Sequence, residues 1–184
     1  MTMTRPAPSA ESAHSLILRC AGVTLALPLA LVVEVVLVVA PAAPLLRMPR
    51  YCLGVIDYHG QLAPLIDLAA RLGLSPPRTT LELAEGRIVI LRGRSGLFGY
   101  LTDEVLELCE APVESLPDGE PGSSALHGHA GLVCGMVRYR ADETVPLLVP
   151  GALVPIVAGE QLRKAVAALT GAPAAMPSPA EGQR

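Results

Sequence analysis

The sequence predicts an all-β fold made of two similar halves, each folded as a small barrel. Short apolar runs separated by turn residues follow one another along the chain, which is typical of a β-sandwich or barrel. Of the 184 residues, 51% are hydrophobic but only 3% are aromatic, so Val, Leu, Ile and Ala must build the core. An internal repeat divides the runs into two comparable sets. Because a barrel of half this size is marginal alone, the two are expected to pack together.

The first half is expected to contain five strands, at residues 16–20, 23–27, 31–39, 53–57 and 61–66. The Ala21-Gly22 pair turns the first hairpin, and the sequence YHG at 58–60 turns the last one. The run at 31–39 is either one long strand or a short helical turn that leads into a strand. Asp67 is placed to cap a short helix at 68–72, and Gly73 is placed to end it.

The second half is expected to contain strands at 87–91, 96–101, 105–110, 132–138 and 144–149. A loop rich in Gly, Ser and His occupies 117–131, and a C-terminal helix is expected within 155–170. The Pro-, Ala- and Ser-rich ends at 1–14 and 171–184 are expected to be disordered tails. The ordered domain then covers 15–154, as two intertwined barrel subdomains at roughly 16–75 and 86–150.

The two halves repeat the same sequence features. GVIDY at 54–58, followed by PLI at 64–66, resembles GMVRY at 135–139 followed by PLL at 146–148, at offsets of 81 and 82 residues. Earlier in each half, ILR at 17–19 with Gly22 and Glu34 resembles ILR at 90–92 with Gly96 and Glu107, at offsets of 73 to 74. An insertion in the loop at 117–131 is the simplest reason for the larger offset. The repeat implies two barrels related by a pseudo-twofold axis.

The most hydrophobic stretch, at 23–43, is 21 residues long and could span a bilayer. A membrane-associated protein anchored through this stretch is therefore one alternative. Glu34 lies near its middle, where a carboxylate costs about 2.5–3.5 kcal/mol on insertion scales. Pro28 interrupts the run, and the dense Val content of 32–39 favours strands. We therefore expect strands of a soluble core and no membrane insertion.

Composition argues against nucleic-acid binding and gives little support to catalysis. The net charge of −3 provides no basic face, and the scarce aromatics provide no stacking platform for bases. The four cysteines are too scattered for a zinc site, and His127 and His129 form the only histidine cluster. A Cys–His hydrolase that pairs Cys52 or Cys134 with His59 or His127 is a second, weak alternative. We expect no catalytic, metal or cofactor site.

Four motifs appear in a fixed order along the chain. They are VVEV at 32–35, a proline-bearing segment at 41–49, GVIDYHGQLAPLIDL at 54–68 and GYLTDEV at 99–105. The third follows the pattern G-V-[IVT]-N-L-R-G-x-x-x-P-[VIL]-[IV]-D-L at most positions. In this order and spacing, the motifs resemble those of the CheW family of chemotaxis coupling proteins, over about residues 16–154.

The resemblance implies two five-stranded Src-homology-3-like barrels around a common core, and an adaptor rather than an enzyme. Such an adaptor joins the cytoplasmic tip of a chemoreceptor to the regulatory domain of a CheA-type histidine kinase. It is expected in the cytoplasm, recruited to membrane receptor arrays, in a chemotaxis or pilus-type signalling system, with no cofactor. Both partners would be held together, which raises their effective concentration.

Carried over motif by motif, the resemblance points to partner contacts at Val32, Glu34, Asp57, Tyr58, His59, Gly60, Asp103 and Val105. Roles without a partner stay open for three of these residues. Glu34 could face water at a strand end, His59 could be a solvated turn residue, and Asp103 could pair with an arginine. The chain also departs from the family. His59 replaces an arginine that the family associates with receptor contact, and Val149 replaces an aspartate.

Overall fold

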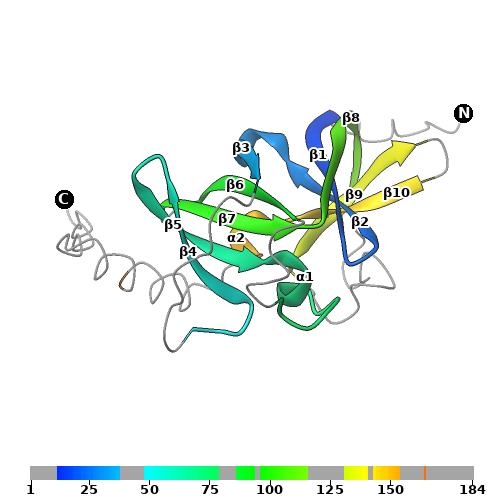
Figure 1. Cartoon of the computed structure of the whole chain (residues 1–184). Helices are drawn as coiled ribbons and strands as arrows, with labels where there is room; N and C mark the ends of the chain where they lie inside the picture. Colours follow the sequence, from blue (N-terminus) through cyan, green and yellow to red (C-terminus); the bar gives the residue numbers. More distant parts are fainter. Residues whose placement is uncertain are drawn as a thin grey trace, which may run out of the picture.

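The computed structural model describes residues 12–37, 48–78, 86–93, 96–115, 131–140 and 143–153, together with Lys164. Within these residues the chain folds almost entirely as strands, which form two five-stranded sheets (Figure 1). The all-β prediction is confirmed. The expected tail at 171–184, most of the loop at 117–131 and, apart from Lys164, the expected helix at 155–170 lie outside the described residues.

The first half forms the five expected strands, β1 Ser12–Cys20, β2 Val23–Pro28, β3 Val32–Leu37, β4 Cys52–Tyr58 and β5 Gln61–Asp67. A 3₁₀ turn at Leu29–Leu31 leads into β3, so the helical-turn alternative for this run is the one observed. Residues 12–14, expected in the tail, instead extend β1 because they pair with β8. The apolar stretch forms β2, the turn and β3 as far as residue 37. No helix in the described part of the chain is long and apolar enough to cross a membrane.

The second half forms β6 Arg87–Gly93, β7 Gly96–Thr102, β8 Glu104–Ser115, β9 Val133–Arg140 and β10 Glu143–Leu148. Each expected strand is present, with ends shifted by a few residues at most positions. The main difference is β8, which runs for 12 residues and ends five residues beyond the expected boundary at 110. The extra length lets β8 pair with two strands, β1 along most of its course and β9 at its end.

The two sheets exchange strands between the halves of the chain. One sheet has the order β1-β2-β10-β9-β8 and closes into a barrel, which we call the closed barrel. The other has the order β3-β6-β7-β5-β4. Each sheet therefore joins the first hairpin of one half to the last three strands of the other. The ranges 16–75 and 86–150, expected as the two barrel subdomains, each contribute strands to both sheets, so neither range forms a sheet by itself (Figure 1).

Residue pairing in the two sheets follows the sequence repeat. Two residue pairs in one sheet have counterparts at the repeat offsets in the other. The antiparallel pair Glu34↔Ile90 corresponds to Glu107↔Ile17. The parallel pair Leu65↔Gly99 corresponds to Leu147↔Ala26. If the order of the closed barrel is written from β8, as β8-β1-β2-β10-β9, each of its strands corresponds by position to one strand of the order β3-β6-β7-β5-β4. The two sheets therefore have the equivalent strand order that the repeat predicts, with the first hairpins exchanged between them.

Only one of the two expected barrels closes within the described residues. In the closed barrel, residues 113–115 of β8 pair with 135–137 of β9. In the other sheet the equivalent strands β3 and β4 are both edges, and no backbone pairing joins them among the described residues. We call it the open sheet. The repeat equivalents of 113–115, at 40–42, lie outside the described residues.

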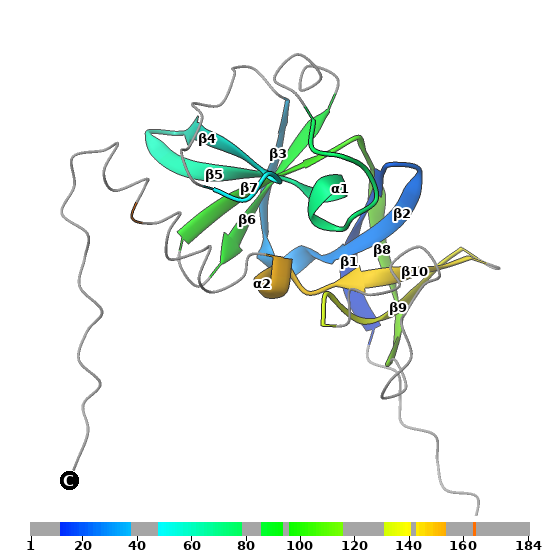
Figure 2. The ribbon, with the colours of Figure 1, turned by 90° about the horizontal axis from the view of Figure 1, so that it is seen from below.

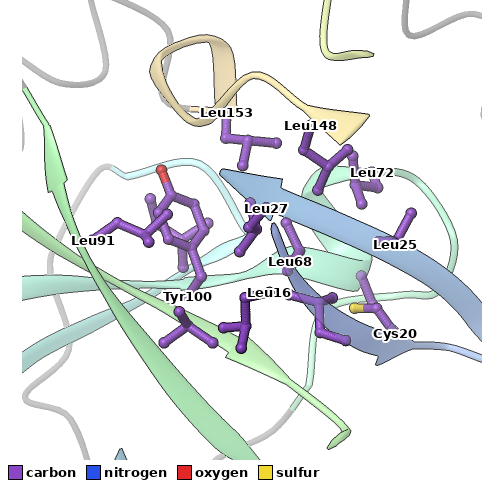
Figure 3. Close-up of a cluster of buried hydrophobic side chains, with 14 of the residues drawn as sticks. Leu16, Cys20, Leu25, Leu27, Leu68, Leu72, Leu91, Tyr100, Leu148 and Leu153 are labelled. Atoms are coloured by element: carbon purple, nitrogen blue, oxygen red, sulfur yellow. The ribbon is translucent and has the colours of Figure 1, made fainter. Parts of the chain in front are cut away.

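Three apolar clusters form the core. The largest lies where the two sheets meet and draws on both halves; Figure 3 shows part of it, with labelled side chains including Leu16, Leu25, Leu27, Leu68, Leu91, Tyr100, Leu148 and Leu153. A second cluster around Ile17 and Val137 fills the closed barrel, and a third around Leu65 and Ile90 lies on the inner face of the open sheet. This arrangement matches the expected common core between two small β units.

Two short helices lie near the junction of the sheets (Figure 2). The helix α1, Leu68–Arg71, begins where the fully buried Asp67 accepts a hydrogen bond from the backbone N of Ala70 at 3.2 Å, as expected. Gly73 follows it with φ 66°, a left-handed conformation that favours glycine. From α1, Arg71 donates to the carbonyls of Ala152 and Leu153 in α2, Pro150–Leu153, and so joins the two helices.

Candidate partner-binding surface

The edge strand β3 exposes a row of apolar side chains. Its partner strand is β6, and a bulge between Val32 and Glu34 shifts the register there. The exposed residues are Val33, Val35 and Leu37 of β3, together with Leu31 of the preceding 3₁₀ turn, and Leu37 is 59% exposed. Val32, by contrast, packs partly against the central core. Edge strands that expose apolar side chains are prone to pair or pack with another chain, so this row is a candidate contact surface.

The β4–β5 hairpin places the next group of expected site residues. His59 and Gly60 form its two-residue loop with φ 51° and 79°, the positive values required by a type I′ turn. The carboxylate of Asp57 accepts a hydrogen bond from the backbone N of Gly60 at 2.7 Å and so stabilises the turn. These contacts fix the backbone conformation of the turn that carries Tyr58 and His59.

Glu34, Tyr58 and His59 meet across the two edges of the open sheet. The hydroxyl of Tyr58 donates to Glu34 Oε2 at 2.6 Å, and His59 Nε2 lies 3.6 Å from the same oxygen. The rings of Tyr58 and His59 pack edge to face with their centroids 4.5 Å apart. The hydrogen bond to Glu34 raises the pKa of Tyr58, which keeps the phenol protonated as the donor. We call this group the β3–β4 clasp.

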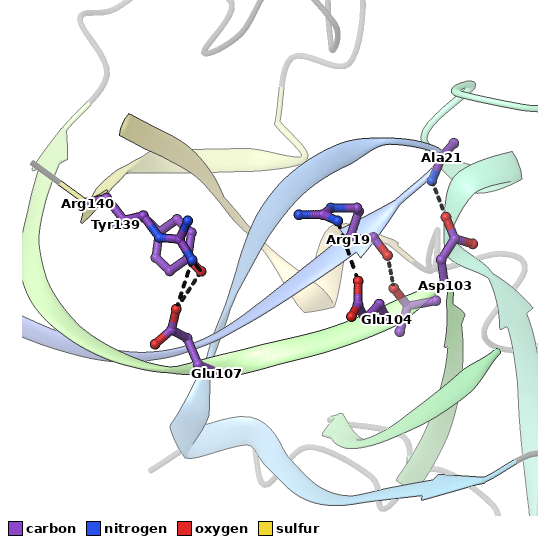
Figure 4. A network of polar contacts seen from close by, with 8 residues as sticks. Arg19, Ala21, Asp103, Glu104, Glu107, Tyr139 and Arg140 are labelled. Atoms are coloured by element: carbon purple, nitrogen blue, oxygen red, sulfur yellow. Dashed lines mark hydrogen bonds and ion pairs between the residues drawn. The ribbon is translucent and has the colours of Figure 1, made fainter. Parts of the chain in front are cut away.

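Asp103 and Val105 lie away from the clasp, at the start of β8. One Asp103 oxygen accepts a hydrogen bond from the backbone N of Ala21 at 2.6 Å, and the other pairs with Arg78 (Figure 4 draws the contact with Ala21). Its own backbone N donates to the carbonyl of Arg19 at 3.1 Å. Asp103 therefore ties the β1–β2 turn to the junction of β7 and β8. Val105 packs partly against the central core.

A second clasp, which sequence reasoning did not identify as a site, lies on the closed barrel. Tyr139 donates to Glu107 Oε1 at 2.5 Å, and the guanidinium of Arg140 lies 3.4 Å from the same oxygen (Figure 4). The hydrogen bonds from Tyr139 and Arg140 lower the pKa of Glu107, so the carboxylate stays ionised. The signal was present in the repeat, since Glu107 and Tyr139 stand at the offsets of Glu34 and Tyr58.

The closed barrel also presents charged pairs along β8. Carboxylates on this strand pair with basic side chains at Arg19–Glu104, His14–Glu110 and Arg138–Glu114. Leu108 stands among them and is 63% exposed. Ion pairs between exposed groups contribute little to the stability of the fold. These charges therefore matter mainly for the charge complementarity between this surface and other molecules.

The thiols give little support to the hydrolase alternative. Burial raises the pKa of Cys20 to about 12, and burial also raises the pKa of Cys52 and of Cys134. A thiol nucleophile needs a lowered pKa or an adjacent base, because the thiolate is the reactive form. Among the described residues no cluster of three His, Cys, Asp or Glu side chains could hold a metal ion. His127 and His129 lie outside those residues.

Comparisons of the sequence with a family model and with curated proteins point to the same family. A family model described as the CheW-like domain matches residues 14–157. The chemotaxis protein CheW of Rhizobium meliloti (strain 1021) is 31% identical over 81 residues, which cover 42% of this chain and 50% of that protein. A probable chemotaxis protein CheW of Rhizobium etli is 40% identical over 68 residues, covering 37% of this chain and 42% of the relative. The chain thus aligns with half or less of the length of these curated relatives.

Structural comparison agrees on the fold. The scaffolding protein TtCheW from Thermoanaerobacter tengcongensis matches with a TM-score of 0.64 and 20% sequence identity, covering 85% of this chain and 94% of the other. At this identity the likeness establishes the arrangement of the strands.

Proposed function

This chain belongs to the CheW-like family, and from that membership we propose that it is a non-catalytic adaptor. It joins the cytoplasmic tip of a chemoreceptor to the regulatory domain of a CheA-type histidine kinase, and acts in the cytoplasm at membrane receptor arrays. An adaptor needs exposed surfaces that complement other proteins rather than a nucleophile or a metal. Holding both partners lets the receptor state bias the kinase state as a coupling free energy.

The observation that carries the proposal is the apolar row on β3 beside the β3–β4 clasp. Val33, Val35 and Leu37 are exposed on the edge strand β3, and Leu31 is exposed at the end of the turn that precedes it. Apolar area of this kind contributes about 25 cal/mol per Å² when a partner covers it. Glu34 lies in the same strand, and together with Tyr58 and His59 it forms the polar clasp at the edge of the sheet. An apolar centre with a polar rim is the usual anatomy of a protein interface.

Six of the expected contact residues belong to this surface in our proposal, namely Val32, Glu34, Asp57, Tyr58, His59 and Gly60. Asp57 and Gly60 act by holding the hairpin turn, and Val32 anchors β3 to the core. The assignment of Asp103 and Val105 to a partner contact stays a prediction. Both Asp103 oxygens already bind groups of this chain, so we expect it to position the neighbouring elements.

Two matched leucines provide the test. Leu37 on β3 is 59% exposed and Leu108 on β8 is 63% exposed, so a lysine at either place leaves the core unchanged. Binding of a CheA-type regulatory domain and of a receptor tip would be measured separately by calorimetry. We expect Leu37→Lys to weaken binding of at least one partner tenfold or more, while Leu108→Lys leaves that same partner's affinity unchanged.

Two results would contradict the proposal. The first is that neither partner binds the unchanged protein at tens of micromolar. The second is that Leu37→Lys binds both partners as tightly as the unchanged protein does, since the β3 row would then lie outside the interface.

A further inference from the structure

We propose that Arg78 is a positioning residue that braces the β1–β2 turn of the closed barrel against the open sheet. Its side chain pairs with two carboxylates at once, Asp67 at the end of β5 and Asp103 between β7 and β8. Asp103 in turn holds the backbone of the β1–β2 turn. We call these three residues the Arg78 brace.

The chain contains two hairpin turns of similar backbone geometry that are held in different ways. The loop residues 21–22 have φ of 49° and 79°, close to the 51° and 79° of residues 59–60. In the β4–β5 turn, the carboxylate that accepts from the backbone belongs to Asp57 of the same hairpin. In the β1–β2 turn it belongs to Asp103, which lies 82 residues from Ala21 and accepts from its backbone N at 2.6 Å (Figure 4). The β1–β2 turn therefore depends on a group outside its own hairpin.

The guanidinium of Arg78 lies between the two carboxylates of the brace. Its Nη2 donates to Asp103 Oδ1, and its Nε lies 3.8 Å from Asp67 Oδ2. The backbone N of Arg78 donates to the same Asp67 oxygen at 2.9 Å, which fixes the base of the side chain. Different nitrogens of one rigid planar group thus face two acids, a geometry that the single nitrogen of a lysine does not reproduce.

Burial makes Arg78 a fixed point on the open sheet. The Asp67 side chain is fully buried and that of Arg78 is 14% exposed, whereas that of Asp103 is 39% exposed. A buried charge that loses its partner is strongly destabilising, so the guanidinium stays beside Asp67. Because the two Asp103 oxygens bind Arg78 and Ala21, the contacts run without a gap from the open sheet to the closed barrel.

The repeat indicates that this ion group does more than fill the space between the sheets. At the offset of 82 residues Asp67 corresponds to Val149, and at offsets of 73 to 74 Asp103 corresponds to Leu29 or Ala30. The equivalent positions therefore carry apolar side chains. Buried ion pairs are often no more stabilising than apolar side chains of similar volume, but their hydrogen bonds define one geometry. Positioning of the turn is therefore the role that we assign to Arg78.

The brace has one consequence for the proposed adaptor function, and only this consequence rests on that function. A partner that binds the β3 row contacts the open sheet, so the closed barrel can respond only through contacts between the sheets. The Arg78 brace is such a contact, beside the central apolar cluster.

Hydrogen exchange followed by mass spectrometry, on the full chain without a partner, tests the brace. Arg78→Lys keeps a positive charge beside Asp67 but does not face both carboxylates, so it should lower the protection of a peptide covering the β1–β2 turn about two- to tenfold. Arg71→Lys is the matched control, because Arg71 also binds two acceptors, the carbonyls of Ala152 and Leu153 in α2. It should leave the β1–β2 turn unchanged, and the β4–β5 turn should keep its protection in both variants.

Asp103→Asn tests the same contact from the other side. The amide keeps an oxygen for the backbone N of Ala21 but loses the charge that pairs with Arg78. Protection of the β1–β2 turn should again fall about two- to tenfold, and the double variant should lose no more than the larger single loss, because both changes break one contact. Asp103→Asn also decides the question if Arg78→Lys does not fold.

Unchanged protection of the β1–β2 turn in Arg78→Lys or in Asp103→Asn would overturn the proposal. An equal loss in Arg71→Lys would do the same, since the turn would then respond to general destabilisation. Losses that add in the double variant would show that Arg78 and Asp103 act separately, which also contradicts the brace. None of these outcomes involves a partner, so failure of the brace is distinct from failure of the adaptor function, which the binding measurements decide.

Discussion

Closure of the barrel depends on the absence of a side chain at Gly135. This residue lies in β9, where it pairs with Ser115 of β8. A Cβ added there would lie 2.8 Å from Val113 Cγ1 and 2.9 Å from the carbonyl oxygen of Glu114. Both distances are shorter than ordinary carbon contacts. The second involves the backbone of β8, which cannot rotate away, so Gly135→Ala must separate β8 from β9.

The expected cost is that of overpacking a closely packed site, about 1–3 kcal/mol in the free energy of unfolding. For a chain of this length, each kcal/mol lowers the melting temperature by about 2–4 °C. Gly151 in α2 provides the matched control. A Cβ there meets no atom within 4 Å, so Gly151→Ala should leave stability unchanged or raise it by about 0.4–1 kcal/mol.

Urea unfolding of the two variants against the unchanged protein measures the difference. Gly135→Ala should unfold at a clearly lower urea concentration, and Gly151→Ala at the same or a slightly higher one. If the two variants unfold together, or if Gly135→Ala matches the unchanged protein, then the pairing of β8 with β9 does not depend on the close approach described above.

Two further predictions concern buried groups. Asp67→Ala removes the helix cap and the acceptor for the backbone N of Arg78. The free energy of unfolding, measured with urea, should therefore fall by about 2–4 kcal/mol. A fall of less than about 0.5 kcal/mol would show that these hydrogen bonds contribute little to stability. Cys20 is fully buried with its pKa raised to about 12, whereas Cys134 is the most exposed of the four cysteines and its pKa is raised only by partial burial. An aromatic disulfide reagent at about pH 8 should therefore label Cys134 in the folded protein and Cys20 only after unfolding, and equal labelling rates without denaturant would contradict the burial of Cys20.

Local features of the fold could be predicted from the sequence because their causes are local. The Asp67 cap and the Gly73 stop depend on residues within one helical turn, and both are observed. The Tyr58-His59-Gly60 hairpin likewise needs only a two-residue loop with positive φ. Strand ends were less accurate, and β8 exceeds its expected end because its last residues pair with β9, which depends on distant sequence.

The exchange of hairpins between the sheets could not be predicted in the same way. The repeat shows that the halves are alike, but a hairpin satisfies the same pattern whether it joins its own half or the other. The exchange is seen only in the folded chain, where pairs such as Glu34↔Ile90 and Glu107↔Ile17 join a strand of one half to a strand of the other.

The candidate site was predicted in part. The β3–β4 clasp unites Glu34, Tyr58 and His59, three residues that the motifs had indicated separately. The second clasp was not predicted from the sequence, although Glu107 and Tyr139 stand at the repeat offsets of Glu34 and Tyr58. A repeat identifies equivalent positions, while contact between two equivalent side chains depends on how the strands curve toward each other.

The adaptor role is tested most directly by asking whether the protein links its two proposed partners. Receptor tips attached to beads would be mixed with a CheA-type kinase, with and without this chain, and the sedimented kinase would be measured. We predict that the kinase sediments with the receptor beads well above its background level only when this chain is present, and that Leu37→Lys reduces the amount. Equal sedimentation with and without the chain would contradict the account.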